Sequence, residues 1–176
     1  MHFLSINQQV MWKGANDWYK PAVPKVEEWH DIPAQELFRE HFRLNGKLAQ
    51  LKQALKGEAW GWKDPRNTFT LEMWLAKFPE AKVIHLIRDR EAVVASLQRR
   101  NNTSGEVQAD ELKDPEYCAK LWQKYVEQGR SYAGRLGKRY LELHYEDLRN
   151  LDPKSIVGLE NFCGKALEAN FKKYLR

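Results

Sequence analysis

Residues 78–97 read FPEAKVIHLIRDREAVVASL, and the fold that the sequence predicts is decided by this stretch. Val83–Ile87 is apolar apart from one histidine, as expected of a strand in a parallel sheet that is buried on both faces. Arg88 and Asp89 end the strand, and the small and apolar residues 92–97 predict a helix directly after it. The stretch is therefore a strand–turn–helix unit, which is the building block of an α/β fold.

Strands and helices alternate on both sides of this unit. Strands are predicted at residues 59–62 and 140–145, and helices at residues 34–56, 69–78, 115–136 and from 153 onward. Asn67 or Thr68 is expected to cap the second of these helices, and Asp152 the last. Residues 101–115 are polar and predict a loop. The order predicts one α/β domain over residues 1–176, with a parallel sheet flanked by helices.

Composition excludes several classes of protein. Of the 176 residues, 29 are Lys or Arg and 24 are Asp or Glu, and this net charge of +5 is too small and too scattered to indicate a nucleic-acid binder. Apolar residues make up 43% of the chain, which excludes a disordered protein. No apolar run is long enough to span a membrane, and the N-terminus does not read as a signal peptide. The sequence indicates a cytoplasmic protein.

The cysteines and histidines do not form a metal-binding pattern. Cys118 and Cys163 are too few for a disulfide framework or a four-cysteine zinc site. His85, His41 and His144 read as hydrogen-bonded core residues rather than ligands, so no metal is predicted.

Polar clusters follow the three predicted strands at residues 63–66, 88–96 and 145–147. Ligands of parallel α/β sheets bind beyond the carboxyl ends of the strands, so these clusters are expected to converge on one crevice. Arg88, with Ser96 eight residues later, offers a guanidinium, a hydroxyl and helix N-terminal amides, a combination that suits a phosphate group. The alternative is that Arg88 pairs with Asp89 or Glu91 and that Ser96 is solvated.

Several motifs resemble one known family. WGWKDPR at residues 60–66, the stretches at residues 78–89 and 92–97, and YLELHYEDL at residues 140–148 resemble the sulfotransferases that use 3'-phosphoadenosine 5'-phosphosulfate (PAPS). The resemblance implies a P-loop NTPase-like α/β fold of the sulfotransferase type. It also implies transfer of a sulfonate group from PAPS to a hydroxyl or amine acceptor, with release of 3'-phosphoadenosine 5'-phosphate (PAP).

The same resemblance implies roles for four residues. Arg88 and Ser96 would hold the 3'-phosphate of the nucleotide, and Tyr145 would lie near the adenine. Lys63 would be catalytic, because a cation there offsets the charge that builds on the bridging oxygen. Two alternatives come from the residues themselves: Lys63 neutralises Asp64, and Tyr145 is an ordinary core tyrosine.

The chain departs from the family pattern at its start. Residues 1–16 contain no Ser/Arg-Ser-Gly loop, which in the family wraps the 5'-phosphosulfate, so an N-terminally truncated fold is expected. The open sheet edge would then need covering, either by a rearranged sheet or by a strand from a second copy or a partner chain. The alternative function is a degenerate, inactive member that serves as a nucleotide-binding or assembly module.

A second departure concerns the catalytic base. Pro65 occupies the position where cytosolic members carry a histidine, and the sequence leaves the base open among Asp64, Glu27, Glu28 and His30. Arg66 either contacts the sulfonate or an acidic acceptor, or pairs with Asp64 or Glu72.

Overall fold

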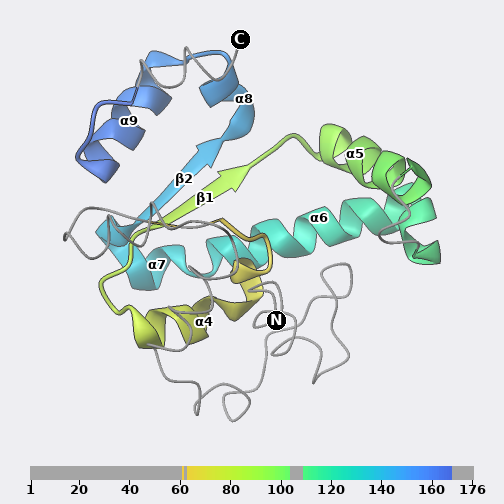
Figure 1. The fold of residues 1–176 in the computed structure, drawn as a ribbon, viewed down its shortest axis with the longest axis horizontal. Coiled ribbons are helices and arrows are strands. Elements are labelled where there is room, and N and C mark those ends of the chain that lie inside the picture. The colour runs from red at the N-terminus through yellow and green to blue at the C-terminus, as the bar shows by residue number, and fades with distance from the viewer. Residues whose placement is uncertain (1–60, 62, 104–108, 168–176) are drawn as a thin grey trace. The chain divides into compact units, whose positions relative to one another are not determined.

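The computed structural model describes residue 61, residues 63–103 and residues 109–167 (Figure 1). The chain divides into two compact units, Met1–Glu80 and Ala81–Arg176, and each is described by itself. The helix predicted at residues 34–56 lies outside the described residues, as does the strand predicted at residues 59–62 except for Gly61. The prediction of a single domain over residues 1–176 stays a prediction.

The first unit contributes helix α4 (Asn67–Lys77) to the described residues. The predicted helix is confirmed, but Asn67 and Thr68 lie inside it and the N-cap residue is Arg66. The Asp64 carboxylate lies two residues before that cap and accepts a hydrogen bond from the backbone amide of Arg66 at 2.9 Å. The turn before the helix is therefore organised by Asp64, which is why the helix starts earlier than the cap pattern predicts.

The second unit is built on two parallel strands, β1 (Val83–Ile87) and β2 (Tyr140–His144). Val83 pairs with Tyr140 and Ile87 pairs with His144, so the strands start and end together. Figure 1 shows the two arrows side by side and pointing the same way. Between the strands the chain is mostly helical, as a parallel connection requires. The fold is thus mixed α/β, with a small parallel sheet of two strands among the described residues.

Helices make up most of the remainder of this unit. They are α5 (Arg90–Thr103), η2 (Asp110–Lys113), α6 (Pro115–Arg130), α7 (Ala133–Leu136), η3 (Gly137–Arg139), α8 (Tyr145–Arg149) and α9 (Pro153–Cys163). The carboxylate of Asp152 accepts from the Ser155 amide at 2.8 Å, which confirms Asp152 as the cap of α9. Asp114 caps α6 in the same way through the Glu116 amide at 2.8 Å. In both helices proline follows the cap, where its missing amide hydrogen costs no hydrogen bond.

The loop predicted over residues 101–115 is wrong at both ends. α5 continues to Thr103, and η2 forms one tight turn before α6. Asn101 is 4% exposed, and its side-chain oxygen accepts a hydrogen bond from the Ala109 amide at 3.0 Å. The polar composition of this stretch predicts a loop, but the buried side chain of Asn101 binds the backbone of Ala109 and supports the end of α5.

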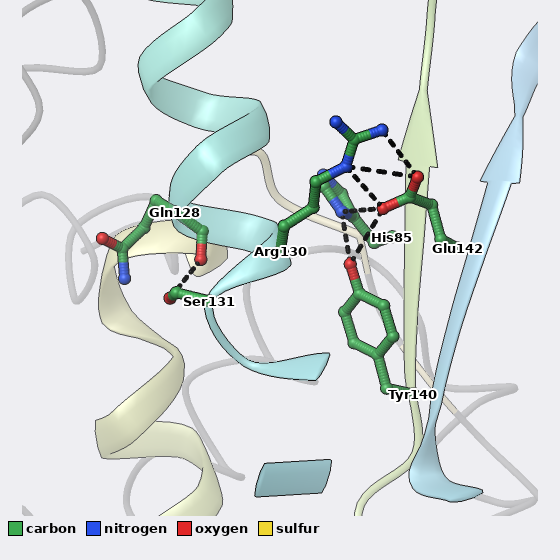
Figure 2. Close-up of polar contacts among 6 residues, drawn as sticks. All are labelled: His85, Gln128, Arg130, Ser131, Tyr140 and Glu142. Carbon is green, nitrogen blue, oxygen red and sulfur yellow. Dashed lines mark hydrogen bonds and ion pairs between the residues drawn. The ribbon is translucent and has the colours of Figure 1, made fainter. Parts of the chain in front are cut away.

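The helix predicted over residues 115–136 is interrupted. α6 ends at Arg130, and the hydroxyl of Ser131 donates a hydrogen bond to the Gln128 carbonyl at 2.7 Å (Figure 2). Tyr132 then donates its amide to Gly129 rather than to Gln128, over 3.4 Å. A serine hydroxyl that competes for a backbone carbonyl in this way commonly bends or ends a helix.

The two faces of the sheet are covered differently. On one face, Gly129 of α6 lies directly against the His85 ring, so that an added Cβ would meet three ring atoms at 2.9 Å or less. On the other face, Leu143 of β2 forms a core cluster with Leu148, Ile156 and Leu159 from α8 and α9. Side chains alternate between faces along a strand, which explains how β2 serves both layers.

β1 is less buried than its sequence predicts. Ile84 is 45% exposed and Leu86 is 49% exposed, whereas Ile87 is 4% exposed. The expected burial on both faces is therefore wrong for Ile84 and Leu86. α9 packs beside β2 through Leu143, and its cover does not extend to these two side chains of the neighbouring strand.

Candidate functional site

The carboxyl ends of β1 and β2 bring two predicted binding residues together. Ile87 and His144 are the last paired residues of the two adjacent strands, and Arg88 and Tyr145 are the residues that come directly after them. The guanidinium carbon of Arg88 lies 5.2 Å from the centroid of the Tyr145 ring. This separation suits a cation–π contact, which holds a charged group over an aromatic face. Arg88 is exposed and Tyr145 is partly buried, so the pair is accessible at the surface of this unit.

The backbone of the turn after β1 is held from several directions. The Asp89 carboxylate accepts from the Ala92 amide at 2.8 Å and so caps the start of α5. The Glu146 carboxylate accepts from the Asp89 amide at 3.1 Å. The indole nitrogen of Trp122 donates to the Arg88 carbonyl at 2.9 Å. Hydrogen bonds thus link α5, α6 and α8 to Arg88 and Asp89, the two residues that follow β1.

Two of these contacts were not foreseen in the sequence. Glu146 follows Tyr145 in the Tyr-Glu-Asp turn, and the parallel alignment of the strand ends is the signal that places it beside Asp89. Trp122 lies on α6, 34 residues beyond Arg88 in the chain. No local pattern distinguishes it from the other tryptophans, because its partner is a backbone carbonyl.

Ser96 lies in the second turn of α5 and is partly buried. The helix places it about 9 Å along the axis from Arg90, at a rise of about 1.5 Å per residue. The Ala92 amide is already engaged by Asp89, so this amide is not available to the phosphate cradle that the sequence predicts. The joint role of Arg88 and Ser96 stays a prediction.

Lys63, Asp64 and Arg66 belong to the first unit. Lys63 is exposed. Arg66 and Asp64 form an ion pair with 2.7 Å between a terminal guanidinium nitrogen and Oδ2, and each side chain is 9% exposed. The guanidinium also donates through Nε to Oδ1 at 2.9 Å. Pairing with Asp64, one of the alternatives for Arg66, is therefore present in the structure.

This ion pair bears on the search for a base. Oδ1 of Asp64 accepts from the backbone amide and Nε of Arg66, and Oδ2 accepts from its terminal nitrogen. Both carboxylate oxygens are therefore occupied in holding the turn before α4. The other candidate bases, Glu27, Glu28 and His30, lie outside the described residues, as does the expected core residue His41. The convergence of Lys63 with the strand ends also stays a prediction.

A second polar cluster lies between α6 and the sheet (Figure 2). His85 Nδ1 lies 2.7 Å from the Tyr140 hydroxyl and 3.7 Å from the Glu142 carboxylate. Arg130 reaches the same carboxylate from α6 through two nitrogens, at 3.0 Å and 2.8 Å. The cluster links β1, β2 and α6 through side chains at the start and middle of the strands rather than at their carboxyl ends.

Burial, hydrogen bonds and neighbouring charges shift the pKa values of the groups in this cluster. Burial lowers the pKa of His85, although Glu142 opposes the shift. Burial, together with the Glu142 charge, raises the pKa of Tyr140 to about 12. The hydrogen bond from Arg130 lowers the pKa of Glu142. The cluster is therefore a neutral imidazole and phenol beside one anion–cation pair, which favours a structural role. His85 behaves as the sequence predicts, whereas His144 is exposed and its predicted core position is wrong.

The described residues contain no group of three or more His, Cys, Asp or Glu side chains arranged to hold a metal ion. Within the same part of the chain, the helices are too short or too polar to cross a membrane.

Comparison with known proteins gives one clear match. The profile of the sulfotransferase family matches residues 5–169. The chain belongs to the sulfotransferase family. The motifs at the β1 turn and at the end of β2 both lie inside the matched region, and membership implies a P-loop-like fold and a sulfonate donor. No curated protein and no solved structure matches the chain.

Proposed function

We propose that this sulfotransferase-family chain binds PAPS at the carboxyl ends of β1 and β2 and transfers its sulfonate to a hydroxyl or amine acceptor. The observation that carries the proposal is the contact between Arg88 and Tyr145 over 5.2 Å. It presents a cation for a phosphate group beside an aromatic ring for a base, at the edge where parallel α/β sheets bind ligands.

Each residue of the proposed site has a distinct task. Arg88 binds the 3'-phosphate through its planar fork of donors, which matches the oxygens of that group. Ser96 adds a neutral hydrogen bond from α5. Tyr145 supports both the adenine and the Arg88 guanidinium. PAPS supplies the sulfonate group and leaves as PAP after the transfer. Lys63 stabilises the negative charge that develops on the leaving oxygen.

Calorimetric titration of the purified chain with PAP, and with AMP as the ligand that lacks the 3'-phosphate, tests the proposal. We expect PAP to bind more tightly than AMP. Arg88→Ala should remove about 1.5–3 kcal/mol of PAP binding, or about ten- to hundredfold in affinity, because a charge-assisted contact is lost.

Arg135→Ala is the matched control, because Arg135 also lies over a tyrosine ring, that of Tyr132 at 5.8 Å, in a segment before β2 rather than after it. It should leave PAP affinity unchanged. Equal affinity of the native chain for PAP and AMP would contradict the proposal. PAP binding without turnover of PAPS on any acceptor would instead favour the nucleotide-binding or assembly module.

A further inference from the structure

Arg88 carries most of the proposed site, and an exposed arginine is useful there only if its backbone is held in one place. Arginine loses up to about 2 kcal/mol of rotamer freedom when it is ordered, so a mobile main chain beneath it would weaken phosphate binding further. The peptide group between Arg88 and Asp89 is therefore informative.

Both polar ends of this peptide group are bound by side chains from distant elements. The Arg88 carbonyl accepts from the Trp122 indole of α6 at 2.9 Å. The next amide, that of Asp89, donates to the Glu146 carboxylate of α8 at 3.1 Å. The carbonyl and the amide belong to the same peptide unit, so the two contacts hold one plane from both of its polar ends.

Neither contact is required by local secondary structure. Asp89 already caps α5 through the Ala92 amide, so the helix start is satisfied without Trp122 or Glu146. Glu146 also sits directly after Tyr145, whose ring contacts the Arg88 guanidinium. Trp122 of α6 and Glu146 of α8 thus hold the main chain at Arg88, and Tyr145 of α8 contacts its side chain.

We propose that Trp122 and Glu146 are positioning residues, which fix the Arg88–Asp89 peptide and thereby aim Arg88 at the 3'-phosphate of the nucleotide. This inference rests on the proposed function of Arg88. It assigns the two residues no contact with the nucleotide, so their effect must pass through Arg88.

Calorimetry on the full chain with PAP and AMP tests this inference. Trp122→Phe removes the donor and keeps the aromatic ring, and Glu146→Ala removes the acceptor. We expect each to weaken PAP binding about three- to tenfold, the effect of one lost hydrogen bond, and to leave AMP binding unchanged. Glu146→Gln keeps a carbonyl oxygen for the Asp89 amide and should retain the native PAP affinity.

Combination with Arg88→Ala separates positioning from a general loosening of the fold. If Trp122 and Glu146 act through Arg88, their substitution should have no further effect on PAP affinity in the Arg88→Ala background. Tyr132→Phe and Glu127→Gln are matched controls on polar groups that form hydrogen bonds to Gln128 and Gln123 of α6. Both should bind PAP as the native chain does.

The outcomes distinguish this inference from the proposed function. If the native chain does not prefer PAP over AMP, the proposed function is overturned, and the inference with it. If the native chain prefers PAP but Trp122→Phe and Glu146→Ala keep that preference, only the inference is overturned. Additive losses in the Arg88→Ala background, or equal losses for AMP, also overturn it. The hydrogen bond of Glu146 lies in the first turn of α8 and is exposed, so Glu146→Ala decides the matter if Trp122→Phe lowers stability.

Discussion

Arg88 shows how one side chain depends on residues that the sequence places far away. Its guanidinium lies over Tyr145, its carbonyl accepts from Trp122, and the following amide donates to Glu146. Arg88 stands out in the sequence because it follows a strand, and Ser96 because it lies eight residues later in the helix that comes next. Trp122 and Glu146 do not stand out, because hydrogen bonds to backbone groups require a particular position rather than a particular motif.

His85 leads to a prediction about pH. Burial lowers the pKa of His85 below its ordinary value of 6.5, so the unfolded chain takes up a proton at a higher pH than the folded chain does. The free energy of unfolding should therefore be highest above about pH 6.5 and should fall as the pH drops from there through the folded-state pKa. His85→Gln should remove this fall, as measured by urea denaturation at several pH values between about 7.5 and 5.5.

Glu142 and Tyr140, which lie against His85, do not titrate in the same window. Arg130 lowers the pKa of Glu142, so this carboxylate stays charged, and the pKa of Tyr140 is raised to about 12. A constant difference in stability between the native chain and His85→Gln across the window would contradict the prediction.

The packing of α6 on the sheet depends on a glycine. Gly129 leaves room for the His85 ring, which in turn reaches Tyr140 and Glu142 of β2. In a helix a glycine is ordinarily unfavourable by about 0.5–1 kcal/mol relative to alanine. At Gly129, the close approach of α6 to the His85 ring of β1 outweighs the preference of a helix for alanine over glycine.

Gly129→Ala should therefore destabilise the fold by about 1–3 kcal/mol, because the new methyl group overlaps the His85 ring. Gly158→Ala is the matched control in α9, where an added Cβ meets no atom within 4 Å. It should stabilise the fold by about 0.5–1 kcal/mol through helix propensity alone. Chemical denaturation of both variants gives the two values, and a stabilising Gly129→Ala would show that the ring can move aside.

At the scale of the whole chain, the proposed transfer gives Lys63 a role in turnover and Arg88 a role in nucleotide binding. Lys63 lies in the first unit and Arg88 in the second. Lys63→Ala should lower turnover of PAPS by about a hundredfold, because a charge that acts in the transition state is lost, while PAP affinity changes little. Lys77→Ala, in the last turn of α4, is the control. Equal losses in turnover and in PAP binding would instead make Lys63 a ground-state contact.

The strands, most of the helices and the family could be predicted from local sequence. Val83–Ile87 and Asp152–Pro153 are local signals: apolar runs form buried strands, and an acidic cap before proline starts a helix. The errors arose where distant groups decide the outcome. Asn101 extends α5 because it binds the Ala109 amide, and the exposure of Ile84 depends on how far α9 reaches.

The sequence by itself determined the α/β class, the strands around residues 83–87 and 140–144, and membership of the sulfotransferase family. The class and the strands follow from hydrophobic periodicity, which acts over a few residues, and the family follows from the motifs at residues 60–66, 78–97 and 140–148. The tertiary structure alone decided that Tyr145 lies against Arg88 and that Trp122 and Glu146 hold the turn beneath it. Such contacts depend on strand register and helix packing, which only the folded chain establishes.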